Sequence, residues 1–433
     1  MTYVLNVVYL ILLAFFSPWL VYKACTTGKY RRGILRKVRG DGPRRMSAAP
    51  CVWFHGVSVG EIHLLRPIVQ GFRRRHPDWE CVISSTTDTG YDEAAKHFSD
   101  LRVFYWPLDF SWAVNRALRL VNPSFVVLAE GELWPNFLAA ACKRGIAIAL
   151  VNGRIGPGSF RNYERLRPLA RSLFEKLDIL LAQNADYAEC YRRLGAPSDR
   201  VHVTGSVKYD GVRTDRQNAK TREMARLLGI VPGDVVWVAG STQAPEEELV
   251  LGIYQRLRRQ WPGLRLILVP RQKERFDEVA SLLDRRGHLF VRRTELKEPY
   301  RTRDVVLVDT IGDLSSVWGL ADVAFVGGSL DGHRGGQNMI EPAAYGAAVV
   351  FGPHVWNFRD TADRLVASGG AMQVADKLEL EAAIGRLLGD AAERERLGSA
   401  ASRFVRKQQG ATERTLDYLD TLLAGGRWRS EAA

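Results

Sequence analysis

The stretch CVWFHGVSVGE, residues 51–61, contains the unit from which most of the chain is built. An apolar run of strand length ends at His55, a loop with Gly56 and Gly60 follows, and Glu61 lies at the start of a helical stretch. A strand followed by a helix is the repeat of parallel sheets that carry helices on both faces. Because ligands of such sheets bind beyond the carboxyl ends of the strands, the residues that follow each strand are the candidates for function.

The same alternation extends through the rest of the chain. Strand-like runs in the first half occupy residues 51–56, 81–86, 102–107, 124–130, 146–152 and 178–183. After a polar helical segment at 211–230, strand-like runs resume at residues 234–241, 264–270, 304–310, 322–329 and 347–353. The sequence therefore predicts an α/β protein with two doubly wound, mostly parallel sheets that face a cleft.

The sequence predicts five segments along the chain. They are a membrane anchor (1–22), a basic juxtamembrane linker (23–48), an N-terminal Rossmann-like domain (49–215), a C-terminal Rossmann-like domain (216–410), and a C-terminal helix and tail (411–433). No glycine-serine or proline-rich linker separates the two halves, so they are expected to pack and hinge.

Composition excludes several classes of protein. The 433 residues are 46% hydrophobic and 25% charged, which are globular values. Five scattered cysteines exclude a disulfide framework and a zinc site of paired cysteines. The formal net charge of +13 is concentrated in residues 23–45, where nine basic side chains face a single acid, Asp41. A nucleic-acid-binding protein more often spreads its basic residues over the folded domain, so nucleic acid is not an expected partner.

The first 22 residues contain no charged side chain and form an apolar run of about 20 residues, close to the length that crosses a bilayer. The basic segment follows this run, so the positive-inside rule places the body on the cytoplasmic side of the membrane. A full span is favoured only weakly over a shallow interfacial helix. Anionic membrane lipids are the partners expected for the basic segment.

Acidic and basic side chains follow the strands of the first domain. Glu61 lies in the first turn of a helix, where by itself it is more typical of a capping carboxylate. Glu130 and Glu132 follow the strand at 124–130, and a buried carboxylate is costly unless it has a partner. Lys208 follows a further strand and has the charge to neutralise a phosphate or carboxylate, although a lone loop lysine is usually just solvated.

In the second domain, Arg271 ends a strand and is placed to bind an anion. The stretch STQAPEEE, residues 241–248, is read as ordinary helix capping or as a source of phosphate-binding donors. The glycine-rich stretch at 327–358 contains Asn338 and Glu341 and predicts a phosphate-binding loop before a helix, with Glu341 accepting from ribose hydroxyls. The eight histidines do not cluster at metal-ligand spacing, so no metal site is predicted.

Several motifs together resemble a known family. The N-terminal apolar segment, SVGE, ELWPN, NGRI, GSVKYD, ILVPR, FVGGS and GPHVWNF occur in the order found in 3-deoxy-D-manno-octulosonic acid (Kdo) transferases. The resemblance covers essentially the whole chain. It implies the GT-B fold of two Rossmann-like domains, CMP-Kdo as donor, the lipid A precursor as acceptor, and no metal or other cofactor.

The resemblance also implies roles for single residues. Glu61 corresponds to the general base of an inverting transfer, and Glu130 and Lys208 correspond to residues that stabilise the transition state. The positions that correspond to the CMP-binding stretches are Pro270, Arg271, Gly312, Asp313, Leu314, Asn338, Met339, Ile340 and Glu341.

Three stretches depart from the family pattern. GDL at 312–314 replaces the more usual GEL, Gln337 stands where a histidine is common, and STQAPEEE replaces a stretch that usually contains a histidine. These departures concern contacts to CMP rather than the reaction.

Two other interpretations stay open. Another GT-B nucleotide-sugar enzyme, a UDP-sugar transferase or an epimerase, would retain Arg271 and residues 338–341 but gives no reason for SVGE beside a membrane anchor. A non-enzymatic scaffold at a membrane surface accounts for the basic segment but leaves Glu130, Glu132 and the glycine-rich loop unexplained. Neither the number of Kdo residues transferred nor any protein partner follows from the sequence.

Overall fold

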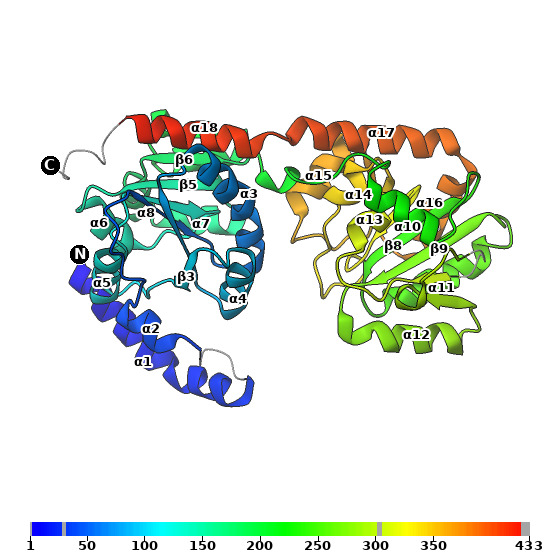
Figure 1. Ribbon diagram of the computed structural model, residues 1–433, viewed down its shortest axis with the longest axis horizontal. Helices are drawn as coiled ribbons and strands as arrows, with labels where there is room; N and C mark the ends of the chain where they lie inside the picture. The colour runs from blue at the N-terminus through cyan, green and yellow to red at the C-terminus, as the bar shows by residue number, and fades with distance from the viewer. Residues whose placement is uncertain (1, 28–31, 301–304, 426–433) are drawn as a thin grey trace. The chain divides into compact units, whose positions relative to one another are not determined.

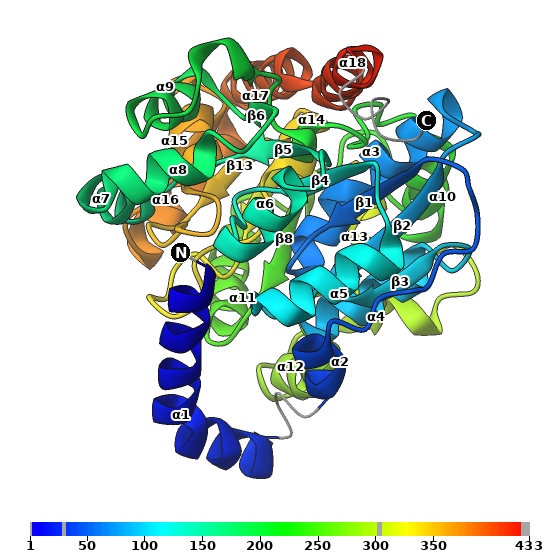
Figure 2. The same ribbon diagram turned by 90° about the vertical axis from the view of Figure 1, so that its left-hand side faces the viewer.

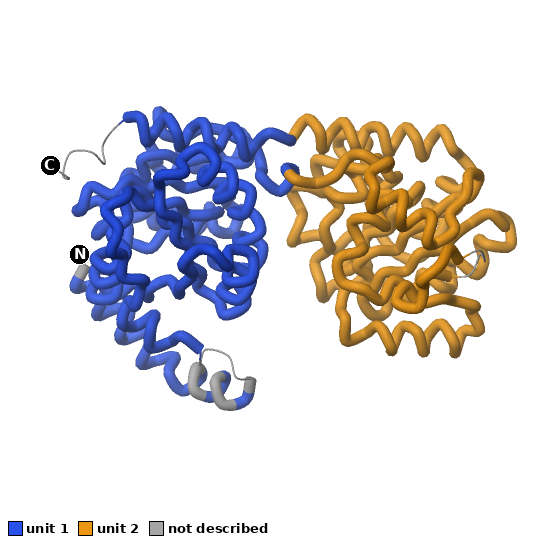
Figure 3. Tube along the Cα trace, in the orientation of Figure 1, with its two compact units in different colours: residues 1–210, 409–433 blue, residues 211–408 orange. Residues whose placement is uncertain are grey.

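The computed structural model describes residues 2–27, 32–300 and 305–425. The chain divides into two compact units (Figure 3). Unit 1 contains residues 1–210 and 409–433, and unit 2 contains residues 211–408. The last part of the chain thus returns to unit 1, where the sequence alone predicted a separate helix and tail.

Unit 1 is built on a seven-stranded parallel sheet with strand order β3-β2-β1-β4-β5-β6-β7 (Figure 1). Its strands are β1 (Cys51–His55), β2 (Glu80–Ser85), β3 (Arg102–Tyr105), β4 (Phe125–Ala129), β5 (Ala147–Gly153), β6 (Ile179–Ala182) and β7 (Val201–Val203). The order 3-2-1-4-5-6 is that of the Rossmann fold. The six strands predicted for this half are confirmed, and the short edge strand β7 is the further strand expected before Lys208.

Helices cover both faces of this sheet. They are α3 (Val59–Arg75), α4 (Asp88–His97), α5 (Ser111–Val121), α6 (Pro135–Cys142), α7 (Pro157–Arg165), α8 (Arg167–Phe174), α9 (Ala185–Arg193) and α18 (Ala411–Ala424). Successive residues of β1 point to opposite faces, so Trp53 packs with Phe137 of α6 while Phe54 packs with Phe72 of α3. Burial on both faces explains why the strands read as continuous apolar runs.

Helix α18 packs against α3 although hundreds of residues separate them in sequence. Leu416 is fully buried, and a Cβ on Gly71 would lie 2.3 Å from the Leu416 Cδ1 atom. Arg75 of α3 forms ion pairs with Glu413, Asp417 and Asp420 of α18. Close apolar packing and this charge cluster explain why the C-terminal helix belongs to unit 1.

The N-terminal region forms α1 (Thr2–Thr27) and α2 (Ile34–Arg39). The start of helix α1 contacts α5, where the Asn6 side chain hydrogen-bonds to Ser111, and the rest of α1 extends away from the sheet (Figure 2). The Tyr9 hydroxyl donates to Asp109 Oδ2 over 3.0 Å. Among the residues that the structure describes, no helix is both long enough and apolar enough to cross a membrane. Polar contacts of Asn6 and Tyr9 join the first turns of α1 to unit 1, and the membrane anchor over residues 1–22 stays a prediction.

Unit 2 is built on a second parallel sheet with order β10-β11-β9-β8-β12-β13-β14. Its strands are β8 (Val235–Thr242), β9 (Leu264–Pro270), β10 (Phe290–Arg292), β11 (Val305–Leu307), β12 (Val323–Val326), β13 (Ala348–Phe351) and β14 (Ala371–Gln373). The five strands predicted here are confirmed. Strands β10 and β14 escaped prediction because each ends in a polar residue, Arg292 or Gln373, and so lacks the apolar run that revealed the equally short β11.

The helices of unit 2 pack on the two faces of its sheet (Figure 1). They are α10 (Ala219–Leu227), α11 (Glu246–Leu257), α12 (Phe276–Arg285), α13 (Leu314–Trp318), α14 (Ile340–Ala344), α15 (Arg359–Ala367), α16 (Lys377–Gly389) and α17 (Ala391–Gln408). Short 3₁₀ turns complete the chain at η1 (Ser198–Arg200), η2 (Val207–Tyr209), η3 (Lys273–Arg275) and η4 (Arg293–Glu295).

Candidate active site

Each sheet has one point where the strand order reverses, and ligands of open α/β sheets bind there. In unit 1 this point lies between β1 and β4, which pair in parallel. In unit 2 it lies between β8 and β12. Four of the stretches that the sequence singled out lie at the ends of these strands: residues 56–61, 130–132, 241–246 and 327–330.

Glu61 is held by the start of α3. The Val57 N–H donates to Glu61 Oε2 over 2.9 Å, and the Ser58 hydroxyl donates to Glu61 Oε1 over 3.1 Å. Ser58 is the N-cap of α3 and accepts in return from the Glu61 N–H. The capping role inferred from the sequence is therefore present, in a variant of the capping box where the glutamate accepts from the N–H of Val57 instead of that of the N-cap residue. Gly56 makes room for it, because a Cβ there would lie 3.2 Å from that of Glu61.

The carboxyl group of Glu61 is nevertheless unusual for a capping residue. Burial raises the pKa of Glu61 to about 7, against the stabilising hydrogen bonds from Val57 and Ser58. The negative charges of Glu130 and Glu132 raise this pKa further. Burial likewise raises the pKa of Glu132. A carboxyl group that changes protonation near neutral pH is suited to accept a proton from a substrate.

Glu130 lies at the centre of a charge cluster at the end of β4. Its side chain is 13% exposed, and Lys208 Nζ approaches Oε1 to 2.9 Å. The Arg154 Nε–H donates to Oε2 over 2.9 Å, and the Asn152 amide donates to Oε1 over 3.3 Å. The structure thus brings Glu130 and Lys208 together, as an ion pair, from positions far apart in the sequence.

Asn152 and Arg154 are site residues that the sequence analysis did not select, although both belong to the motif NGRI. Asn152 Oδ1 accepts from the N–H of Val207, the residue before Lys208. Asn152 therefore links the loop that carries Lys208 to the side chain of Glu130. Asn152 lies at the end of β5 and Arg154 directly follows it, and β5 pairs with β4. Their position at the end of a predicted strand could therefore have identified them as candidate site residues.

Backbone strain marks the same positions. Within the described residues, the non-glycine residues with positive φ are Asn122, Glu130, Asn152 and Ser241. Asn122 ends helix α5, where this conformation is common. The other three follow or lie in β4, β5 and β8, at the edges that carry the candidate sites. Such strain costs about 1–3 kcal/mol per residue and is concentrated at functional sites.

In unit 2, the buried side chain of Glu246 organises the glycine-rich loop. Its carboxylate accepts from the N–H groups of Gly328, Ser329 and Leu330 over 2.6, 2.9 and 3.1 Å, and from the Gln243 N–H over 3.1 Å. The sequence suggested that this loop and STQAPEEE offer donors to a phosphate. For residues 328–330 this interpretation is wrong, because Glu246 already accepts from these donors.

Arg271 follows β9 and its backbone N–H donates to Thr242 at the end of β8. Its guanidinium Nε–H donates to Gln337 Oε1 over 3.1 Å. Pro270 is the last residue of β9 and is buried. Gln337, which stands where the family commonly has a histidine, therefore contacts Arg271, a predicted anion-binding residue.

The remaining predicted positions of unit 2 lie at the starts of two short helices. Asp313 accepts from the Thr310 hydroxyl over 2.7 Å and pairs with Arg293, while Gly312 has φ +103° and Leu314 begins α13. Asn338 donates to Glu341 Oε1 over 3.2 Å, and burial raises the pKa of Glu341.

Helix α14 begins at Ile340, two residues later than Asn338, the residue predicted to open it. Met339 and Ile340 are buried, so the polar groups of this stretch are those of Asn338 and Glu341.

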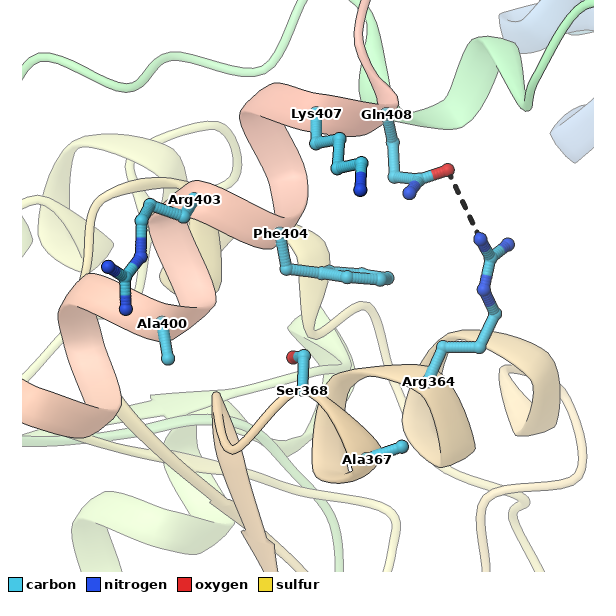
Figure 4. A pocket seen from close by; sticks show the side chains of 8 residues that line it. All are labelled: Arg364, Ala367, Ser368, Ala400, Arg403, Phe404, Lys407 and Gln408. Carbon is cyan, nitrogen blue, oxygen red and sulfur yellow. Dashed lines mark hydrogen bonds between the residues drawn. The ribbon is translucent and has the colours of Figure 1, made fainter.

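A surface pocket of unit 2 lies between α15 and α17 (Figure 4). Arg364, Arg403 and Lys407 contribute its positive charge, and Arg364 donates to Gln408 over 3.4 Å. It contains none of the residues predicted from the sequence. Arg364 and Lys407 lie in the last turns of their helices, where positive charge stabilises the helix dipole, and the pocket is not assigned a ligand.

Comparison with solved structures identifies the fold. A putative UDP-N-acetylglucosamine 2-epimerase from Listeria monocytogenes matches with a TM-score of 0.60 over 87% of this chain and 98% of that chain, at 13% identity. A UDP-GlcNAc 2-epimerase from Neisseria meningitidis bound to UDP-GlcNAc matches with a TM-score of 0.53 over 83% of this chain and 99% of that chain, at 12% identity. At this identity the likeness concerns the fold alone: two parallel-sheet α/β domains of the GT-B type.

Sequence comparison then identifies the family. Residues 29–211 match the family model of 3-deoxy-D-manno-octulosonic-acid transferase (kdotransferase). The transferase of that name from Haemophilus influenzae is 31% identical, over 91% of this chain and 92% of the relative. The one from Bordetella pertussis is 35% identical, over 87% of this chain and 88% of the relative. The chain is a glycosyltransferase that belongs to the 3-deoxy-D-manno-octulosonic acid transferase family.

Proposed function

We propose that this protein transfers Kdo from CMP-Kdo to a hydroxyl group of the lipid A precursor lipid IVA, with inversion at the anomeric carbon and without a metal ion. Glu61 supports the proposal most directly, as a largely buried carboxylate with a raised pKa at the switch point of unit 1. A sugar hydroxyl is a weak nucleophile and must lose its proton during the transfer. General-base catalysis of this kind contributes about 10²–10⁴-fold to the rate.

Glu130 and Lys208 stabilise the transition state in this proposal. Lys208 is paired with Glu130, and Asn152 and Arg154 hold the carboxylate of Glu130 from other directions. This network is preorganised, so little rearrangement accompanies the development of charge at the reacting centre. In the proposed assignment, unit 1 binds the acceptor and supplies the base.

CMP-Kdo binding falls to unit 2. Arg271 has a planar guanidinium suited to a phosphate, and the polar groups of Asn338 and Glu341 suit a nucleoside. CMP leaves as a phosphate monoester, so a positive charge near its phosphate favours departure. The residues assigned to CMP are those named from the family resemblance, with Gln337 added because it contacts Arg271.

Shallow association with the cytoplasmic face of the inner membrane completes the proposal. Helix α1 exposes Leu10, Ile11, Phe15, Phe16 and Trp19, each at 47% or more. Insertion of these apolar side chains into the membrane interface and attraction of the basic segment 23–45 to anionic lipids would together bring the enzyme to its lipid acceptor. Co-sedimentation with anionic vesicles tests this directly: loss of binding on replacing Phe15 and Phe16 by Ser supports it, and unchanged binding contradicts it.

A transfer assay tests the reaction. Purified protein is mixed with lipid IVA in detergent, freshly generated CMP-Kdo and excess EDTA, and the products are read by mass. Stepwise gain of Kdo units supports donor, acceptor and metal independence together, and counts the transfers. CMP binding without any gain in mass would contradict the acceptor. UDP binding without CMP binding would favour the alternative, a UDP-sugar transferase or epimerase of the same fold.

A further inference from the structure

Helices α3 and α4 bring together three metal-ligating side chains that are dispersed in the sequence. His63 lies on α3, whereas Glu93 and His97 lie one turn apart on α4. His63 Nε2 is 3.2 Å from Glu93 Oε1, and His97 Nε2 is 2.7 Å from the same oxygen. One ligand atom of each residue lies within 4.8 Å of the other two. The spacing of the histidines along the sequence predicted no metal site, but helix packing brings His63 beside Glu93 and His97 across a gap of thirty residues.

The donor set selects a class of ion. Two imidazole nitrogens and one carboxylate oxygen suit a divalent first-row transition metal, whereas magnesium and calcium take oxygen ligands almost exclusively. Zinc binds histidine nitrogen and carboxylate oxygen at about 2.0–2.2 Å, and three protein ligands leave one position for water. Ligand atoms around a tetrahedral ion of this size lie a little over 3 Å apart, so small side-chain rotations bring the present set to bonding distance.

We propose that His63, Glu93 and His97 form a binding site for a divalent transition metal, with zinc as the test ion, that ties α3 to α4. In the structure the Glu93 carboxylate hydrogen-bonds to the imidazole of His97 and lies within ion-pair distance of His63. The side chains of Glu93 and His97 are about one-fifth exposed and that of His63 is half exposed, so an ion reaches the site from solvent. The positive charges of Arg66 and Lys96 act on His63 and oppose the ion.

The site is separate from the proposed reaction centre. Residues 61 and 63 of one helix point in directions roughly 200° apart, so the ion does not face the Glu61 carboxylate. A link to Glu61 exists through the backbone: Ser85 and Thr87, just before α4, donate to the Val57 carbonyl, and the Val57 N–H donates to Glu61. The metal therefore restrains α3, α4 and the loop at Val57 that orients Glu61, and takes no part in the transfer. This inference does not rest on the proposed function.

Calorimetric titration with Zn²⁺ tests the site, on full-length protein without an affinity tag and freed of metal with EDTA. Wild-type protein is expected to bind a single equivalent. His63→Ala and His97→Ala are each expected to weaken that binding at least about tenfold, since even the loss of an outer-shell partner costs 10–100-fold. His76→Ala is the matched control, because His76 pairs with Asp420 in the same unit but has no third ligand in the described structure.

Two further measurements separate binding from folding. His63 is half exposed, so His63→Ala is expected to keep the circular dichroism spectrum of the wild type. Zn²⁺ is expected to raise the melting temperature of the wild type but not that of His63→Ala, because an ion bound only to the folded state stabilises it. Equal zinc affinity in the wild type and both histidine variants, or no binding by the wild type, would overturn the proposal and leave a hydrogen-bonded surface cluster.

Discussion

The side chain of Glu61 has a fixed orientation and a pKa close to neutral pH, and both result from its immediate surroundings. Val57 and Ser58 orient the carboxylate, while burial and the charges of Glu130 and Glu132 oppose its ionisation. We predict that Glu61→Gln lowers turnover at least about a hundredfold and leaves CMP affinity nearly unchanged. Single-turnover rates and CMP titration measure the two effects. Glu164→Gln, at an exposed ion pair with Arg193, is the control expected to retain activity.

The pH dependence follows from the same residue. A general base works in its ionised form, so kcat/KM is expected to rise with pH and to level off above about 7, the raised pKa of Glu61. Below that pH a growing fraction of Glu61 is protonated and cannot accept a proton. Steady-state rates across the pH range measure this profile. The same rise in the residual activity of Glu61→Gln would show that another group is the base.

Arg271 belongs to the donor half of the proposed site. Its guanidinium contacts Gln337, and replacing it by alanine removes a positive charge from the proposed CMP phosphate. Arg271→Ala is predicted to weaken CMP binding at least about tenfold, and to slow the chemical step less than it weakens binding. Equilibrium titration with CMP and single-turnover kinetics distinguish these two effects. Unchanged CMP affinity would remove Arg271 from the donor site.

At the scale of elements, one buried carboxylate joins a helix to a loop. Glu246, at the start of α11, accepts from three successive N–H groups of the glycine-rich loop after β12. Glu246→Ala leaves these buried donors without an acceptor, at about 1–3 kcal/mol each. We therefore predict a destabilisation of unit 2 by about 3 kcal/mol or more, together with weaker CMP binding.

Two further variants of α11 test whether the hydrogen bonds of Glu246 cause this loss of stability. Glu246→Gln keeps one carbonyl acceptor and is expected to fall between wild type and alanine in chemical denaturation. Glu248→Ala is the control on the same helix, because Glu248 is exposed, pairs with Arg286, and such pairs contribute about 1 kcal/mol or less. If Glu246→Ala and Glu248→Ala lost equal stability, the stabilising role of the Glu246 hydrogen bonds would be contradicted.

At the scale of the whole molecule, the chain leaves unit 1 at residue 210 and returns to it at residue 409. Leu416 of α18 is fully buried against α3, so Leu416→Ala is expected to cost unit 1 about 2–5 kcal/mol. The melting transition of unit 1 should move down while that of unit 2 stays in place. Leu387→Ala, in the core of unit 2, is the reciprocal control in differential scanning calorimetry. A shift of the unit 2 transition by Leu416→Ala would contradict the division into units.

Much of the architecture was predictable from the sequence because it is encoded locally. Buried parallel strands are continuous apolar runs, so β1, β4, β8 and β12 were recognised from their composition. Their carboxyl ends then pointed to Glu61, Glu130 and the stretch around Glu246. Strands β10 and β14 were missed because each ends in a polar residue and lacks the apolar run that revealed the equally short β11.

What the sequence determined, by itself, is the series of strands and helices, the family motifs and the acidic and basic residues at the strand ends. Only the tertiary structure decided which of these residues meet. It paired Lys208 with Glu130, added Asn152 and Arg154, gave the loop donors to Glu246, and placed His63 beside Glu93 and His97. The physical reason is range: strand and helix patterns arise from neighbouring residues, whereas burial, ion pairs and ligand sets depend on atoms that only the packed chain brings within a few ångströms.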